Sequence, residues 1–252
     1  MISTKSKLDL EKLREGGKIL AATLMEIKKA VVPGVKTSDL DELAYRLVTK
    51  AGGKPAFLHY RPEGAKSDYP ASLCVSINEE IVHGIPGSRK LKAGDLVSLD
   101  LGLEYKGMFT DMAITVGAGK IRPEDKKLLE VTQEALAVGI AAAGPGKTTG
   151  DIGAAIEAYV KKAGFTIIKG LAGHGVGYAP HEEPYVPNYG HQGKGEELLP
   201  GMVLALEPMV STGTSAIKLL PDDWTFITRD KSPNAHFEKT IVITKTGAEI
   251  LT

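Results

Sequence analysis

The stretch LVSLDLGLEYKGMFTDMAITV (residues 96–116) contains two aliphatic runs, each interrupted by one aspartate. Two such runs on either side of a short turn predict a β-hairpin. With the turn centred on Tyr105 and Lys106, antiparallel pairing places Asp100 directly opposite Asp111. Directly opposed residues have Cβ atoms roughly 4.5–5.5 Å apart, and like charges at that distance destabilise a sheet. This hairpin therefore needs a partner for its two carboxylates, and a cation would serve.

Composition limits the class of protein. The chain has 252 residues, 42% of them hydrophobic and 25% charged, which is typical of a soluble globular protein with a substantial core. Lys+Arg and Asp+Glu each number 31, so the net charge gives no electrostatic case for binding DNA or an anionic membrane. The single cysteine, Cys74, excludes an internal disulfide and fits a reducing compartment. Because neither a signal peptide nor an apolar membrane span is found, we expect a cytoplasmic protein.

An internal repeat predicts two related halves. PGVKTSDLDELAYRLVTKAG (33–52) and PGKTTGDIGAAIEAYVKKAG (145–164) align without a gap at an offset of 112 and share eight of twenty residues. Similar turns, caps and stops surround many helices, but one ungapped register across all of them favours duplication. We expect a single catalytic domain over residues 1–252. Its halves span about 10–118 and 122–250.

The second half has its own pair of acids in strand-like runs. GMVLALEPMV (201–210) contains Glu207, and AHFEKTIVIT (235–244) contains Glu238. A single acid of this kind is most often an edge-strand charge that points to solvent. Four acids at matching places in a repeated pattern are not explained that way, and a lysine such as Lys239 could neutralise only one of them.

A glycine-rich segment supplies a further candidate ligand. GLAGHGVGYAPHEEPYVP (170–187) places His174 between glycines and His181 seven residues later. A lone histidine in such a loop is usually only a polar loop residue. With four acids it completes an oxygen-rich set that suits divalent Mn, Fe, Co or Zn, and bridging carboxylates suit two ions roughly 3.5–4 Å apart. The predicted metal ligands are Asp100, Asp111, His174, Glu207 and Glu238.

Seven short motifs, in order along the chain, resemble those of type I methionine aminopeptidases. They are HGIP (83–86), SLDLG (98–102), FTDMAITV (109–116), GHGVG (173–177), HEEP (181–184), ALEPM (205–209) and FEKTIVIT (237–244). The resemblance implies an α/β (α+β) pita-bread fold, in which two pseudo-two-fold-related halves of antiparallel strands are flanked by helices. It implies a monomeric hydrolase with two divalent ions. Such an enzyme removes the N-terminal methionine of nascent chains at the ribosome when the second residue is small, by attack of a metal-bridging hydroxide.

The resemblance also implies roles for individual residues. One ion would be surrounded by Asp100, Asp111 and Glu238, and the other by Asp111, His174, Glu207 and Glu238. Glu207 would also shuttle a proton, His181 would polarise the carbonyl, and His83 would contact the scissile amide. A histidine on a turn after a strand is the alternative for His83. Tyr69, Cys74 and Trp224 match residues around the methionine side chain.

Three departures from the family pattern concern the substrate pocket. FLHYRPEGAKSDYP (57–70) is longer than the corresponding family loop, so a place for Tyr60 in the pocket is not expected. Tyr178 stands where an arginine is usual, and Pro180 stands where an aromatic residue is frequent. We expect these changes to reshape the pocket rim and to leave the metal ligands intact.

Two alternatives remain open. Aminopeptidase P and prolidase share this fold and a similar ligand set, but they typically carry a further N-terminal domain. This chain is not expected to have one, because its first predicted helix begins near residue 10. A catalytically inactive pita-bread protein that binds other proteins is the second alternative, and the presence of all five ligand types argues against it.

Overall fold

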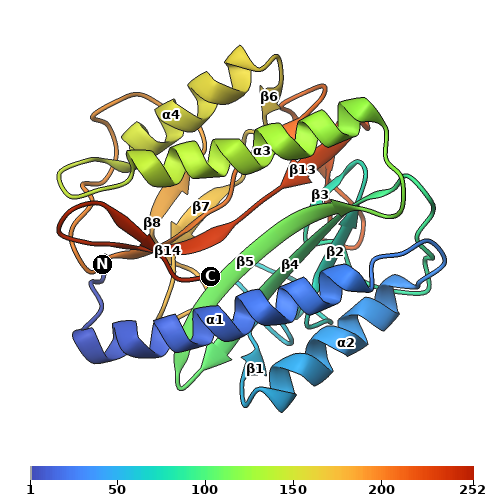
Figure 1. Ribbon diagram of the computed structural model, residues 1–252, viewed down its shortest axis with the longest axis horizontal. Helices are drawn as coiled ribbons and strands as arrows, with labels where there is room; N and C mark the ends of the chain where they lie inside the picture. The colour runs from blue at the N-terminus through green and yellow to red at the C-terminus, as the bar shows by residue number, and fades with distance from the viewer. Residues whose placement is uncertain (1) are drawn as a thin grey trace.

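The helices of this computed structural model, which describes residues 2–252, agree with the predicted pattern (Figure 1). They are α1 (Lys7–Lys29), α2 (Thr37–Lys50), α3 (Pro123–Ala142) and α4 (Thr149–Lys162). At the start of α4, Thr148 and Asp151 each accept a hydrogen bond from the other's backbone N–H, which satisfies two free donors of the first turn. The bounds of α2 and α4 differ by 112 residues, the offset of the sequence repeat, so both copies form the same helix.

The strands pair only in antiparallel fashion within residues 2–252. In the first half, β4 (Leu96–Tyr105) pairs with β1 (Lys54–Pro55), β2 (Cys74–Ile77) and β5 (Met108–Gly117). A five-stranded sheet of the second half has the order β15 (Ala248–Ile250), β14 (Lys239–Ile243), β9 (Val203–Leu206), β7 (Ala172–Gly175) and β8 (Glu182–Pro187). One small sheet contains β13 (Asn234–His236), β10 (Met209–Ser211) and β6 (Thr166–Ile167); another contains β11 (Ile217–Leu219), β12 (Phe226–Thr228) and β3 (Glu80–Val82).

Helices lie on two opposite sides of the strands (Figure 1). α1 lies against β4 and β5, and α2 lies against β1 and β2. On the other side, α3 lies against β13 and β10, and α4 lies against β8 and β6. Each pair of helices buries its apolar face in a separate core. The first core includes Leu20, Leu24, Val97 and Leu99, and the second includes Leu128, Ile152, Leu204 and Ile241. Helices over antiparallel strands in two layers confirm the expected fold class.

The predicted hairpin forms, but its predicted register is wrong by two residues. β4 and β5 are joined by Lys106 and Gly107, both at positive φ (52° and 77°), as a two-residue type I′ turn requires. Gly102, not Asp100, therefore lies opposite Asp111. Because side chains alternate between faces, a shift of two residues leaves both acids on the same face, as diagonal neighbours.

The two acids of the second half were expected inside strands. They lie instead at breaks between strands. Glu207 separates β9 from β10, and Glu238 separates β13 from β14. The pairing of β9 with β14 and of β10 with β13 keeps one register across these breaks, which places Glu207 opposite Glu238. The direct opposition of two carboxylates expected for the first half therefore occurs in the second.

Threonine hydroxyls join the two halves along β5. The Thr240 hydroxyl accepts a hydrogen bond from the N–H of Asp111 and donates one to its carbonyl, both at 2.8 Å. The Thr115 hydroxyl likewise accepts from the N–H of His236 (2.8 Å) and donates to its carbonyl (2.9 Å). Both threonines are buried, so this seam fixes the backbone on either side of the acidic residues.

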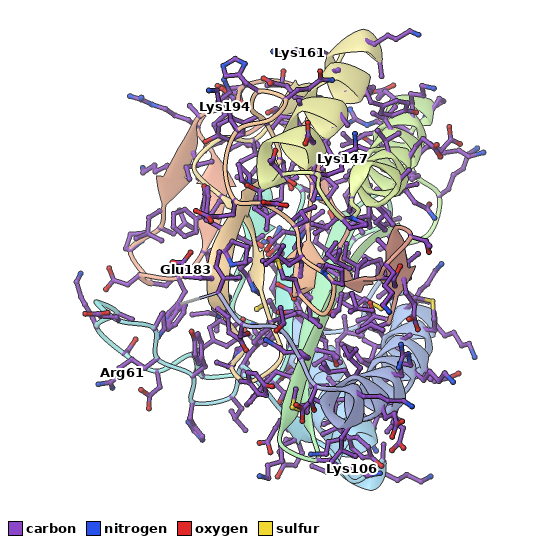
Figure 2. The ribbon with its side chains drawn as sticks, turned by 90° about the vertical axis from the view of Figure 1, so that its left-hand side faces the viewer. Arg61, Lys106, Lys147, Lys161, Glu183 and Lys194 are labelled. Carbon is purple, nitrogen blue, oxygen red and sulfur yellow. The ribbon has the colours of Figure 1, made fainter. Side chains whose placement is uncertain are left out.

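The surface carries the ordinary charged side chains of a globular chain. Lys106, Lys161 and Lys194 project from the periphery in Figure 2, and Arg61 marks the protruding 57–70 loop. None of the helices in residues 2–252 combines the length and apolarity that a membrane crossing requires.

Candidate active site

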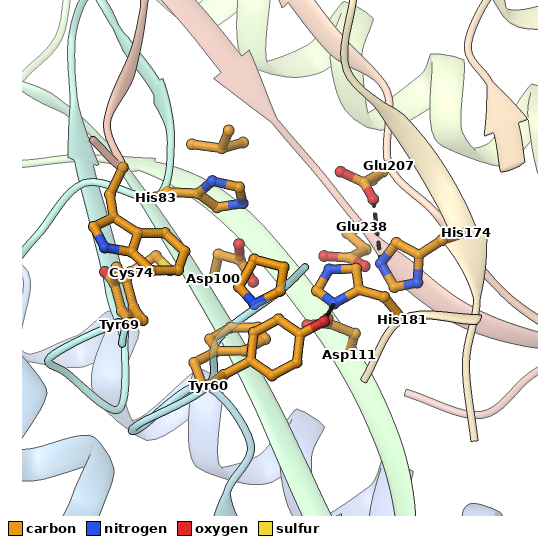
Figure 3. A pocket seen from close by; sticks show the side chains of 14 residues that line it. Tyr60, Tyr69, Cys74, His83, Asp100, Asp111, His174, His181, Glu207 and Glu238 are labelled. Carbon is orange, nitrogen blue, oxygen red and sulfur yellow. Dashed lines mark hydrogen bonds and ion pairs between the residues drawn. The ribbon is translucent and has the colours of Figure 1, made fainter. Parts of the chain in front are cut away.

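A cavity of about 270 Å³ lies where the acidic strands of the two halves meet (Figure 3). Fourteen residues line it, and they include all ten of the predicted site residues. The ten are Tyr69, Cys74, His83, Asp100, Asp111, His174, His181, Glu207, Trp224 and Glu238. Acids and two histidines gather at one end, and aromatic side chains gather at the other (Figure 3).

The acidic end brings together residues from both halves. Ligand atoms of Asp111, His174 and Glu238 all lie within 4.8 Å of one another. Nε2 of His174 lies 3.6 Å from Oε1 of Glu207, and Asp100 reaches the same cavity from β4. Nδ1 of His174 lies 2.8 Å from the carbonyl of Gly175, which leaves Nε2 to face the acids.

Burial makes the four carboxylates costly to ionise. It raises the pKa of Asp100 to about 7, although a hydrogen bond with the Asp111 side chain acts in the opposite direction. Burial and the neighbouring carboxylates raise the pKa values of Asp111, Glu207 and Glu238 well above the ordinary range. Oδ1 of Asp100 and Oε1 of Glu238 are buried without a hydrogen-bond partner in the described chain. The acids therefore lack compensation from the protein itself.

Lys106 and Lys239 do not supply that compensation. Lys106 pairs with Glu15 on the surface. Lys239 donates hydrogen bonds to the Met112 sulfur (3.6 Å) and the Thr252 carbonyl (2.9 Å). Within residues 2–252, no lysine or arginine forms an ion pair with the four acids. Carboxylate oxygens with an imidazole nitrogen are suitable donors for divalent transition metals, so the donor set fits a metal centre.

The other end of the cavity is an apolar pocket. Phe57, Tyr69 and Cys74 are buried together, with Trp224 packed against them. The Tyr69 and Trp224 rings are edge-to-face with centroids 5.1 Å apart, and the Tyr69 hydroxyl donates to the Gly84 carbonyl at 2.9 Å. Burial raises the pKa of the Cys74 thiol well above its usual value, so this wall is uncharged at neutral pH. Such a pocket suits an unbranched apolar side chain.

His83 lies between the two ends. It follows β3 with φ of 59°, in the left-handed region that few non-glycine residues adopt and that often marks a functional site. Its ring is edge-to-face to both Trp224 (6.3 Å) and Phe226 (6.1 Å). Burial, and to a smaller extent His181, lower the pKa of His83 to about 4, so it is neutral at physiological pH.

Tyr60 lines the cavity, contrary to the expectation from the longer loop. Its hydroxyl lies 3.0 Å from Nδ1 of His181, and the two rings stack with centroids 5.2 Å apart. Pro62 of the same loop also lines the cavity, and the Trp224 indole N–H donates to Ser67 Oγ at 3.3 Å. The insertion therefore extends the loop without displacing its aromatic residue. Tyr178 and Pro180, expected at the rim, are not among the lining residues.

Sequence reasoning missed His236, which lies behind the acids. Its side chain is 1% exposed, and Nε2 lies 3.6 Å from Glu207 Oε2 and 4.0 Å from Glu238 Oε2. Neither ring nitrogen has a hydrogen-bond partner within residues 2–252. The available signal was its spacing, because residues two apart in an extended chain share a face and His236 stands two before Glu238.

Comparison with known proteins agrees with this geometry. The model of metallopeptidase family M24 matches residues 11–245. Methionine aminopeptidase 1 of Bacillus subtilis (strain 168) is 47% identical over 252 residues, an alignment that covers 100% of this chain and 99% of that protein. The crystal structure of methionine aminopeptidase from Rickettsia prowazekii superposes with a TM-score of 0.96 at 38% identity, covering 100% of both chains.

A more distant likeness concerns the fold alone. Prolidase from Pyrococcus furiosus superposes with a TM-score of 0.77 at 23% identity, covering 99% of this chain and 65% of that chain. The family match spans most of the chain, and the relatives that align over its full length include methionine aminopeptidases. The chain belongs to metallopeptidase family M24.

Proposed function

We propose that this protein is a methionine aminopeptidase that removes the N-terminal methionine from peptides and nascent chains. The observation that carries the proposal is one cavity with an uncompensated acidic centre at one end and an apolar aromatic pocket at the other. An exopeptidase needs this combination, because one end recognises a side chain and the other reacts with its peptide bond. The relatives named methionine aminopeptidases support the same reading.

The acidic centre would hold two divalent ions, drawn from Co, Mn, Fe and Zn. Asp100, Asp111 and Glu238 would hold one, and Asp111, His174, Glu207 and Glu238 the other. When bound, such ions lower the pKa of a coordinated water toward neutrality and polarise a carbonyl. In return they would neutralise carboxylates that the protein leaves unpaired.

The remaining residues would bind and orient the substrate. Neutral His83, between pocket and centre, would contact the scissile amide, and His181 would donate to the oxygen that becomes negative. Tyr60 would hold the Nδ1 side of the His181 ring, which leaves Nε2 free for this task. Glu207 would accept a proton and return it to the leaving amine.

The substrate's methionine side chain would enter the pocket of Tyr69, Cys74 and Trp224. The second residue would then lie beside the centre, where only a small side chain leaves the amide accessible. We also propose a monomeric cytoplasmic enzyme that meets its substrates at the ribosome. In this proposal the single catalytic domain arose by duplication of one half. The constant offset of 112 residues between the bounds of α2 and those of α4 supports this origin.

Peptide turnover tests the proposal. The metal-loaded protein should cleave Met-Ala-Ser, cleave Met-Ile-Ser far more slowly, and lose activity after exhaustive chelation. Faster cleavage of an Xaa-Pro peptide would indicate a prolidase-type enzyme instead. Metal binding without turnover of either substrate would indicate an inactive binding module.

A further inference from the structure

The N-terminal arm, residues 2–6, is bound to the end of the loop that carries His181. Lys5 is buried, and its Nζ forms an ion pair with Oε2 of Glu182 at 2.6 Å. Ser3 Oγ donates a second hydrogen bond to the same oxygen at 2.7 Å. A buried ammonium is tolerated when it is paired and hydrogen-bonded, so this contact fixes both partners. Glu182 directly follows His181.

Glu182 transmits this contact to the loop backbone. Its other oxygen accepts hydrogen bonds from the N–H groups of Tyr178 and Ala179, the latter at 2.9 Å. The loop between β7 and β8, residues 176–181, therefore binds one oxygen of the Glu182 carboxylate, and the arm binds the other oxygen. Burial favours the neutral form of Glu182, but hydrogen bonds from Lys5, Ser3 and the Ala179 N–H, together with the charge of Lys5, lower its pKa, so it is charged at neutral pH.

Tyr178 supports the same contact. Nζ of Lys5 lies 4.4 Å from the centroid of the Tyr178 ring, in a cation–π arrangement. The Tyr178 hydroxyl donates to Oδ2 of Asp9 in the first turn of α1 at 2.9 Å. Tyr178 therefore connects the loop both to the arm and to the first turn of α1.

The loop delivers His181 to the cavity. The His181 ring lies 4.3 Å from that of His174, centroid to centroid, and Nδ1 contacts the Tyr60 hydroxyl. We propose that Lys5 is a positioning residue that, through Glu182, fixes the His181 imidazole in the active site. This inference rests on the proposed aminopeptidase function. Displacing a reacting group by about 1 Å can cost on the order of 10²-fold in rate, so a partly freed loop affects turnover measurably.

Substitution of Lys5 tests the inference. Lys5→Met should lower kcat on Met-Ala-Ser roughly 10-fold and leave KM and metal content unchanged. The loss is smaller than the ~10²-fold cost of a displacement of ~1 Å, because the loop is only partly freed. Lys5→Arg keeps the cation and should restore most of the rate. Lys54→Met is the matched control, because Lys54 pairs with Glu104 at the surface and is absent from the cavity. Its kcat should equal that of the wild type.

A double-mutant cycle separates positioning from general stability. In a His181→Ala background, Lys5→Met should cause no further loss of kcat, because the group that it positions is already gone. Multiplicative losses in the cycle, or an unchanged kcat in Lys5→Met, would overturn the inference. If Lys5→Met does not fold, Ser3→Ala weakens the same carboxylate contact without leaving a buried charge unpaired, and the same cycle applies.

A second readout does not depend on activity. In the metal-free protein, the ring signals of His181 in the NMR spectrum, assigned by their loss in His181→Ala, should shift or broaden in Lys5→Met and not in Lys54→Met. Unchanged signals would contradict the inference. Failure of the wild-type enzyme to cleave Met-Ala-Ser would overturn the proposed function instead, while the NMR comparison would still decide whether Lys5 positions the loop.

Discussion

In the metal-free protein, Asp100 should reduce stability as the pH rises from about 5 to 8. Burial raises the pKa of Asp100 to about 7 in the folded state, against 3.8 in its absence. The folded state therefore binds more protons than the unfolded state between these values. The contribution of Asp100 to the free energy of unfolding is fully present below the pKa of Asp100 in the unfolded state. It is lost as the pH rises through the pKa of Asp100 in the folded state.

The size of the effect follows from the pKa difference. From about pH 5 to pH 7 the unfolded aspartate is ionised and the folded one is not, which costs ~1.36 kcal/mol per pH unit, or about 3 kcal/mol. For a chain of this size that corresponds to a decrease in Tm of roughly 6–12 °C. The buried histidines act in the opposite direction, because burial lowers the pKa of His174 to about 4. The measurement therefore compares two proteins that share those histidines.

Urea unfolding of wild-type and Asp100→Asn protein, both dialysed against a chelator, measures the difference. Between about pH 5 and 8 the wild type should lose about 3 kcal/mol more than the variant. Added divalent metal should remove the difference for the wild type at high pH, because an ion that binds only the folded state stabilises it. Parallel loss in both proteins would refute the view that Asp100 is held in a desolvated, uncompensated site.

Four further substitution experiments probe the site. Asp111→Ala or Glu238→Ala should abolish metal binding and turnover together, as measured by metal analysis of the purified protein alongside the rate. His181→Ala should retain metal and slow turnover by roughly 10²–10³-fold, as for a lost oxyanion donor; loss of metal would make it a ligand. His236→Leu should weaken metal binding ~10–100-fold by calorimetry, whereas His236→Gln, which keeps a donor behind the acids, should bind nearly as the wild type does. Gly102→Ala should cost about 1–3 kcal/mol in urea unfolding, since the new Cβ would lie 2.7 Å from an aromatic ring.

Local signals in the sequence predicted the helices and most of the site. A repeat across turn, cap and helix depends on neighbouring residues, and both copies form the helix that it predicts. The hairpin was predicted as well, but its turn was placed one residue too early. Gly107 was the available signal, because a type I′ turn needs positive φ at its second position. Both acids reached the cavity nevertheless, since an error of two residues preserves the face.

Long-range contacts account for what could not be predicted. Tyr60 and His181 are 121 residues apart in the chain, and only the folded loop shows that the longer 57–70 segment still places Tyr60 in the cavity. His236 is the last residue of β13, and its place opposite Met209 depends on the pairing of β13 with β10. The spacing of His236 from Glu238 indicates a shared face, but no local pattern shows that the imidazole also lies beside Glu207.

The threonine seam has a consequence for the order in which the active site can appear during synthesis. The hairpin of β4 and β5 emerges early and carries Asp100 and Asp111. Glu238, and the Thr240 hydroxyl that holds the backbone of Asp111, emerge more than a hundred residues later. A growing chain would therefore carry two carboxylates and an open sheet edge long before the proposed metal site is complete. Metal capture would mark the completion of folding, and each new enzyme molecule would stay inactive until β14 has left the ribosome.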